Sequence, residues 1–168
     1  SSDVFSSDLN LINNSLGWVI FAIATVTYML TLEPTASFWD CGEFISQGYK
    51  LEVGHPPGNP IFMLTANFFT HFASSPSQVA LCVNAMSGLL SAGCILLLFW
   101  TVTHLVRRLI TKDGQEEYSW MQIALIMGSG VCGALAYAWS DTFWFSAVEG
   151  EVYAFSSFCT ALTFWLIL

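Results

Sequence analysis

Apolar and polar segments alternate along the chain in lengths that predict membrane-spanning helices. Four apolar stretches are each close to the roughly 20 residues that cross a bilayer, and they lie near residues 16–32, 79–106, 121–139 and 152–168. A fifth, residues 61–73, is shorter and follows a proline, which favours an interfacial or re-entrant helix. The pattern predicts an all-α membrane protein whose domain covers residues 16–168.

The polar stretches between these helices predict the topology. Residues 1–15 are rich in serine and asparagine and predict an N-terminal segment outside the membrane, whereas residues 33–78 form a long loop. The only basic cluster, at residues 107–112, belongs in the cytoplasm by the positive-inside rule. The N-terminus is then cytoplasmic, and the loops 33–78 and 140–151 share the extracytoplasmic side. If the apolar stretch in the long loop crossed the membrane, most of that loop would become cytoplasmic.

Composition and charge narrow the class further. Hydrophobic residues make up 55% of the 168 residues and charged residues 10%, well below the quarter or so that is usual in soluble domains. A net charge of −8 argues against nucleic acid as a partner, because a nucleic-acid site needs clustered lysine and arginine. The five cysteines show no spacing typical of a zinc site, so no metal is expected. The last apolar stretch is still apolar at Leu168, which predicts a portion of a longer protein.

Acidic side chains gather in the two loops assigned to one membrane face. An ionised group near hydrocarbon costs roughly 2.5–3.5 kcal/mol unless it faces water or a partner. Asp40 and Glu43 are therefore candidates for function. Other charged or titratable residues that the two loops place on the same side are Lys50, Glu52, His55, Asp141, Glu149 and Glu151.

The motif FWDCGEF at residues 38–44 places Asp40 and Glu43 three residues apart, on the same side of a helical turn. Two such carboxylates can divide into a general base and an orienting partner, because each shifts the pKa of the other. Equally, Asp40 could cap the following helix, with Glu43 completing an arrangement like a capping box. Local spacing does not separate these two interpretations.

The motif GHPPGNP at residues 54–60 predicts a rigid turn that presents His55 at a defined place. An imidazole held in this way can hydrogen-bond a phosphate or a sugar hydroxyl. The simpler interpretation is an interfacial turn with a solvated histidine. Within the two outer loops, Lys50 and His55 are the groups that could compensate phosphate charge.

The second acidic motif, SDTFWFSAVEGEVYAF at residues 140–155, carries Asp141, Glu149 and Glu151. Glu149 and Glu151 are two positions apart, so we expect one of them to serve the site and the other to face the surface. The aromatic residues of this motif are more typical of a membrane-interface belt than of a substrate platform.

Four motifs occur in order: FWDCGEF, GHPPGNPIF, PSQVALCVNAMSG and SDTFWFSAVEGEVYAFSS. Together they resemble the N-terminal part of a family of multi-span membrane proteins related to protein O-mannosyltransferases, over nearly all of residues 30–168. The resemblance implies a C-type glycosyltransferase fold that uses a polyprenyl-phosphate sugar, with mannose as the expected sugar, and modifies protein hydroxyls outside the cytoplasm. It also implies that Asp40 is the base, that Glu43 is the second acid, and that His55 and Glu149 belong to the site.

This chemistry needs no metal or cofactor in principle, since the lipid-linked sugar is itself the substrate. The expected partners are the polyprenyl-phosphate sugar, membrane lipid and extracytoplasmic acceptor proteins. The motifs are closest to the bacterial branch, which favours the bacterial inner membrane with a site facing the periplasm. Two other functions stay open, because membrane acids also mark ion pathways: an ion-coupled transporter, and a non-catalytic membrane subunit.

Overall fold

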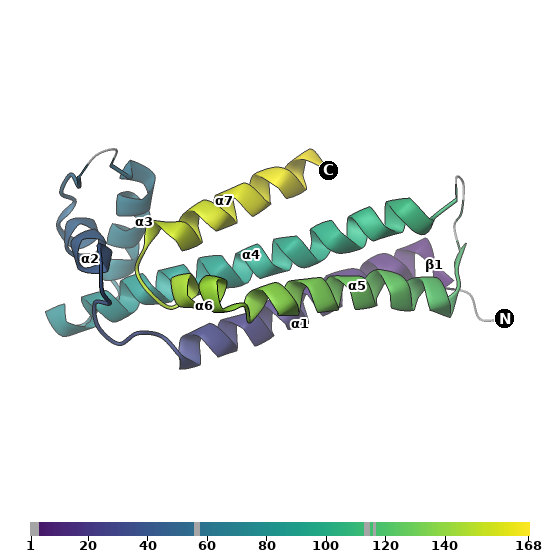
Figure 1. The fold of residues 1–168 in the computed structure, drawn as a ribbon, viewed down its shortest axis with the longest axis horizontal. Coiled ribbons are helices and arrows are strands. Elements are labelled where there is room, and N and C mark those ends of the chain that lie inside the picture. Colours follow the sequence, from purple (N-terminus) through teal and green to yellow (C-terminus); the bar gives the residue numbers. More distant parts are fainter. Residues whose placement is uncertain (1–3, 56–57, 113–114, 116) are drawn as a thin grey trace.

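The computed structural model describes residues 4–55, 58–112, 115 and 117–168. Three long helices run side by side: α1 (Ser6–Leu30), α4 (Val79–Ile110) and α5 (Trp120–Ala138), and α7 (Val152–Ile167) lies along α4 (Figure 1). The shorter helices are α2 (Cys41–Lys50), α3 (Pro60–Thr70) and α6 (Asp141–Ala147), with a 3-10 turn η1 (Pro76–Gln78) before α4. The strands β1 (Val4–Phe5) and β2 (Glu117–Tyr118) form one short antiparallel pair. The predicted all-α membrane class is confirmed.

Three described helical segments are long and apolar enough to span a membrane, namely Ser6–Leu30, Pro76–Ile110 and Trp120–Ala138. The fourth predicted span is α7, which forms a bent pair with α6 at an angle of 109°, as in a broken span or a re-entrant loop. At about 1.5 Å per residue, α3 is only about 16 Å long, half of what a bilayer requires. The short helix predicted within residues 61–73 is thus present, and it packs against α2 and α4.

Helix α1 begins at Ser6, ten residues earlier than the apolar stretch predicts. Leu9 is only 1% exposed in the core, and Ile12 and Leu16 pack against the same core. These positions recur with helical spacing, so one face of the segment is buried although its overall composition is polar. The segment predicted for residues 1–15 is therefore helical from Ser6 onward, and its cytoplasmic location stays a prediction.

Glycines set the close approach of the helices in the core. A Cβ on Gly17 of α1 would overlap the Trp100 indole of α4, and a Cβ on Gly130 of α5 would overlap the Phe99 ring of α4. Small residues that admit an aromatic side chain are typical of helix contacts in membranes. They allow α1 and α5 to pack closely against α4.

The chain order brings the two acidic loops to one end of the bundle. Helices α2 and α3, the bend between α6 and α7, and the end of α1 all lie there, whereas β1, β2 and the N-terminus lie at the other end (Figure 1). The backbone N–H of Glu33 donates to the carbonyl of Val148 at 3.1 Å, and the indole of Trp144 donates to Thr31 Oγ1 at 3.0 Å. The two loops predicted to share a membrane face thus lie together at one end of the bundle, and we call this region the acidic end.

Candidate active site

The acidic end is assembled around a polar side chain from the long helix α4. Asn84 is fully buried, and its amide nitrogen donates to the carbonyls of Glu33 at 2.6 Å and Thr35 at 3.0 Å. These bonds fix the chain that leads from α1 into the first acidic motif. Since Glu33 also bonds to Val148, the first and second acidic motifs are held in one unit.

Asp40 lies directly before α2 with an exposed side chain. It occupies the N-cap position, yet its carboxylate accepts no capping hydrogen bond. The cap interpretation of Asp40 is therefore wrong. The preceding residue, Trp39, has a left-handed backbone with φ of 61° although it is bulky and 90% exposed. Such a conformation is uncommon for a large side chain and costs on the order of 1–3 kcal/mol.

Glu43 and His55 form a clamp between α2 and the loop that follows it. Glu43 Oε1 accepts from the backbone N–H of His55 at 3.1 Å and lies 2.9 Å from His55 Nδ1, and Gln47 Nε2 donates to it at 2.6 Å. A carboxylate only accepts, so Nδ1 carries the proton. Glu43 thus orients His55, and it does not complete a capping box.

The two members of the clamp shift the pKa of each other. Hydrogen bonds from the His55 side chain and backbone, then from Gln47, lower the pKa of Glu43. The hydrogen bond to Glu43 and its charge raise the pKa of His55, and Asp40 adds to this effect. The imidazolium form of His55 is therefore favoured. Pro56 and Pro57 of the same motif lie outside the described residues.

Glu149 and Glu151 are both buried, with 4% and 7% of their surfaces exposed. The expectation that one of them faces the surface is wrong, because the bend between α6 and α7 turns both side chains inward. Burial raises the pKa of Glu149, although a hydrogen bond from Ser37 opposes this shift and Glu33 adds to it. Burial, then the charges of Glu149 and Asp40, raise the pKa of Glu151.

Electrostatic coupling joins these groups into one candidate site. The charge of Asp40 acts on both His55 and Glu151, so the first and second acidic motifs face each other. Cys41 is fully buried between them, and burial raises the pKa of its thiol, which excludes it as an activated nucleophile. Within the described ranges, no three His, Cys, Asp or Glu side chains are arranged to hold a metal ion.

Two predicted substrate-binding residues lie away from this centre. Lys50 is at the opposite end of α2 from Asp40, about 15 Å along the helix, and it pairs with Glu52 at 3.9 Å in solvent. Asp141 is exposed at the start of α6, whereas Glu149 follows the end of that helix. The structure therefore groups Asp40, Glu43, His55 and Glu149 but does not bring Lys50 or Asp141 to them.

Three residues of the site were missed in the sequence. Gln47 follows Glu43 by four positions, and this helical spacing was a signal that could have found it. Asn84 is a lone amide within an otherwise apolar span, which is itself a sign of a buried polar contact. Ser37 offered no comparable signal, because its contact with Glu149 depends on how the chain folds back.

The fold and this site define a membrane protein with an acidic cluster at one end of its helical bundle. The family model of the protein O-mannosyl-transferase TMEM260 N-terminal domain matches residues 40–168. The chain therefore belongs to this family, as the order of its motifs predicted.

Two relatives illustrate the similarity. The protein O-mannosyl-transferase tmem260 of Dictyostelium discoideum is 25% identical over 149 residues, covering 88% of this chain and 16% of that protein. The protein O-mannosyl-transferase TMEM260 of Mus musculus is 29% identical over 144 residues, covering 85% of this chain and 18% of that protein. The chain thus spans less than a fifth of the length of these relatives. No solved structure matches it.

Proposed function

We propose that this chain supplies the catalytic base and part of the donor site of an inverting protein O-mannosyltransferase. The enzyme would move mannose from a polyprenyl phosphate to Ser or Thr hydroxyls of extracytoplasmic proteins. The family and the names of its relatives support this class of reaction. The observation that carries the proposal is an exposed Asp40 beside the Glu43–His55 clamp.

In the proposed step, the acceptor hydroxyl oxygen attacks the anomeric carbon while Asp40 takes the hydroxyl proton. The bond between that carbon and the phosphate oxygen breaks, and the polyprenyl phosphate leaves with the electron pair. One displacement inverts the anomeric centre. General-base assistance of this kind contributes roughly 10²–10⁴-fold to the rate.

The clamp explains why Asp40 and Glu43 have different roles. Glu43 is occupied by His55 and Gln47, and its lowered pKa makes it a weak base. Asp40 has no capping bond to give up and is open to solvent. Glu43 is thus a positioning residue, and His55, protonated at Nδ1 by this contact, would use Nε2 to donate to the departing phosphate.

The buried acids suit contact with the sugar. A carboxyl with a raised pKa keeps its proton more readily, and a protonated carboxyl can both donate to and accept from sugar hydroxyls. We assign Glu149 to this contact. Lys50 and Asp141 stay predictions as substrate ligands. A substrate bound at the acidic site would contact them only at its edges.

We further propose that the acidic end faces the extracytoplasmic side, since the basic residues 107–112 lie at the other end. The bacterial inner membrane, with the site facing the periplasm, stays a prediction. Cysteine introduced at Lys50 should react with an impermeant thiol reagent applied from outside, and cysteine at Lys112 should not. Equal labelling of the two positions would contradict this orientation.

The proposed reaction is tested with the full-length protein, polyprenyl-phosphate mannose and Ser/Thr-containing acceptor proteins from the same compartment. Mannose should appear on the acceptor with the anomeric configuration opposite to that of the donor. Polyprenyl-phosphate glucose serves as the matched donor control. An ion flux without transfer would instead favour a transporter, and neither transfer nor flux would favour a non-catalytic subunit.

A further inference from the structure

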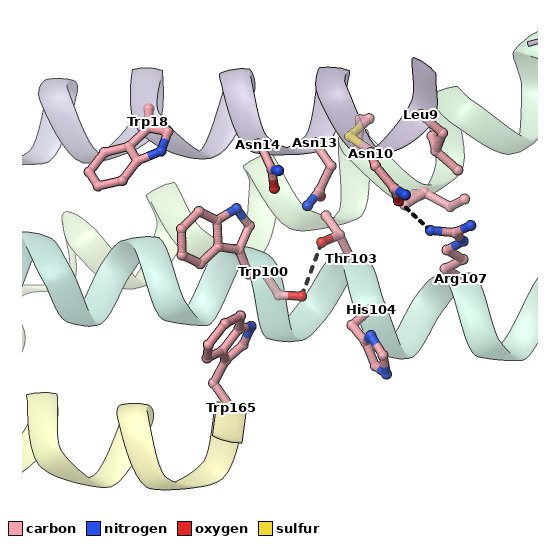
Figure 2. A pocket seen from close by; sticks show the side chains of 12 residues that line it. Leu9, Asn10, Asn13, Asn14, Trp18, Trp100, Thr103, His104, Arg107 and Trp165 are labelled. Atoms are coloured by element: carbon pink, nitrogen blue, oxygen red, sulfur yellow. Dashed lines mark hydrogen bonds between the residues drawn. The ribbon is translucent and has the colours of Figure 1, made fainter. Parts of the chain in front are cut away.

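A second polar site lies at the other end of the bundle, far from the acidic end. A pocket of about 430 Å³ opens among α1, α4, α5 and α7. Figure 2 shows amide side chains of α1 along one wall, with Arg107 at one end of the pocket and tryptophan side chains at the other. Neither the proposed reaction nor the family match gives this pocket a role.

The α1 wall is a row of amides inside a membrane-spanning helix. Asn10, Asn13 and Asn14 follow the spacing that places side chains on one helical face, and all three line the pocket. Asn13 Oδ1 is buried and has no hydrogen-bond partner among the described residues. An unsatisfied buried oxygen costs roughly 1–3 kcal/mol, so this wall is suited to a ligand that donates a hydrogen bond.

Arg107 brings a cation to the pocket without a carboxylate to pair with it. Its guanidinium donates to Asn10 Oδ1 at 2.7 Å, to Ser6 Oγ at 2.7 Å and to the Tyr118 hydroxyl at 3.1 Å. All three acceptors are neutral, and within the described ranges no acid lies at ion-pair distance from it. A guanidinium has five N–H groups, so two remain for an anion.

The other end of the pocket is aromatic. Trp18 and Trp100 meet edge to face at 6.0 Å, and Trp100 lies 5.6 Å from Trp165. Trp100 precedes Arg107 by seven positions on α4, which is about 10 Å along the helix. The pocket therefore changes from cationic near the membrane surface to aromatic towards the middle of the bundle, as an amphiphile would require.

We propose that this pocket binds the headgroup of an anionic phospholipid from the leaflet on the Arg107 side. The phosphate would accept from Arg107, a headgroup hydroxyl would donate to Asn13, and the start of an acyl chain would lie against the tryptophans. Basic pockets between membrane helices on the cytoplasmic side bind such headgroups. Phosphatidylglycerol has the required chemistry, since it combines one phosphate with free hydroxyls.

The test measures binding of phosphatidylglycerol to the full-length protein by native mass spectrometry, with phosphatidylcholine of the same chains as reference. The parent should retain phosphatidylglycerol preferentially. Arg107→Gln should weaken this binding about tenfold or more, because one charge-assisted contact is lost. Arg108→Gln is the matched control, since it removes the same charge one position away, where the side chain is exposed.

Arg107 also connects α1 to Tyr118 through hydrogen bonds, so its substitution can destabilise the fold. A second variant therefore tests binding with Arg107 unchanged. Asn13→Leu keeps Arg107 in place and removes the amide oxygen that would accept from the headgroup hydroxyl, and it too should weaken binding. Equal losses in Arg107→Gln and Arg108→Gln would overturn the proposal, as would a parent with no preference for phosphatidylglycerol. Competition by glycerol phosphate as strong as that by the lipid would overturn the lipid as the source of the phosphate.

Discussion

The two ends of the helical bundle hold their charges in opposite ways. At the acidic end, Glu149 and Glu151 are buried, the charge of Asp40 acts on Glu151, and the titratable His55 is held by Glu43. At the other end, Arg107 is permanently charged and is surrounded by neutral oxygens. The acidic end contains carboxyls and an imidazole whose pKa values are shifted by their neighbours, whereas the guanidinium at the other end stays charged.

This contrast favours acid–base chemistry at the acidic end and anion binding at the Arg107 end. Groups whose pKa values are pushed apart, as in the Glu43–His55 clamp, are typical of acid–base sites. A fixed guanidinium held by three hydrogen bonds is typical of a preorganised anion site. Single substitutions at the acidic end test this contrast. Their expected effects decrease from mannose transfer, through thermal stability, to the pH dependence of stability.

Apart from substitution of the proposed base Asp40, the largest effect is expected from breaking the clamp. Glu43→Gln removes the charge that holds the protonated His55, so we expect mannose transfer to fall about 10- to 100-fold, from the loss of one or two charge-assisted bonds. Transfer by the full-length protein measures this. Glu52→Gln is the matched control, because Glu52 is an exposed acid near the same loop. Unchanged transfer in Glu43→Gln would remove Glu43 from the site.

The next effect concerns the packing that holds the two acidic motifs together. A Cβ on Gly150 would lie 2.9 Å from Asn84 Oδ1 and 3.0 Å from Val83 Cγ1. Gly150→Ala should therefore destabilise the fold by about 1–3 kcal/mol through overpacking. The melting temperature in detergent measures this. Gly128→Ala is the matched control, since a Cβ there meets nothing within 4 Å, and it should leave the melting temperature unchanged or slightly raised.

The smallest effect is expected in the pH dependence of stability. Burial, Glu149 and Asp40 raise the pKa of Glu151 in the folded protein, so as the pH rises this side chain loses its proton earlier in the unfolded chain than in the folded protein. The contribution of Glu151 to stability is then greatest below the ordinary pKa of a glutamate and falls as the pH rises through the raised value. Glu151→Gln should flatten this fall, seen as melting temperatures that decline less between acid and neutral pH. Parallel curves for parent and variant would contradict the inward placement of Glu151.

Much of the fold could be predicted from hydrophobic pattern alone. The apolar stretches gave α4 and α5 with small errors at their ends, because a helix in lipid must satisfy its own backbone and so follows the apolar run. The beginning of α1 was missed, because Asn10, Asn13 and Asn14 hide the buried row of Leu9, Ile12 and Leu16. The segment is polar on average, although its buried apolar residues recur with helical spacing.

The site was predicted in part, and the errors have a common physical cause. Asp40, Glu43, His55 and Glu149 were selected from local motifs, and the fold brings all four to one end. Local spacing, however, carries no information on how a helix bends between spans. The turn after α6 decides that both Glu149 and Glu151 point inward, and it leaves Asp141 outside. Contacts between distant segments, such as that of Asn84 with the loop after α1, could not be inferred from spacing.

We propose that catalysis resides at the acidic end through Asp40. The most direct measurement compares mannose transfer by the full-length parent with Asp40→Asn and with Asp8→Asn, a matched change of an exposed aspartate in the first turn of α1 at the other end. We predict that Asp40→Asn loses about 10²–10⁴-fold in transfer with an unchanged melting temperature, and that Asp8→Asn keeps the parental rate. Full transfer by a folded Asp40→Asn protein would contradict the account.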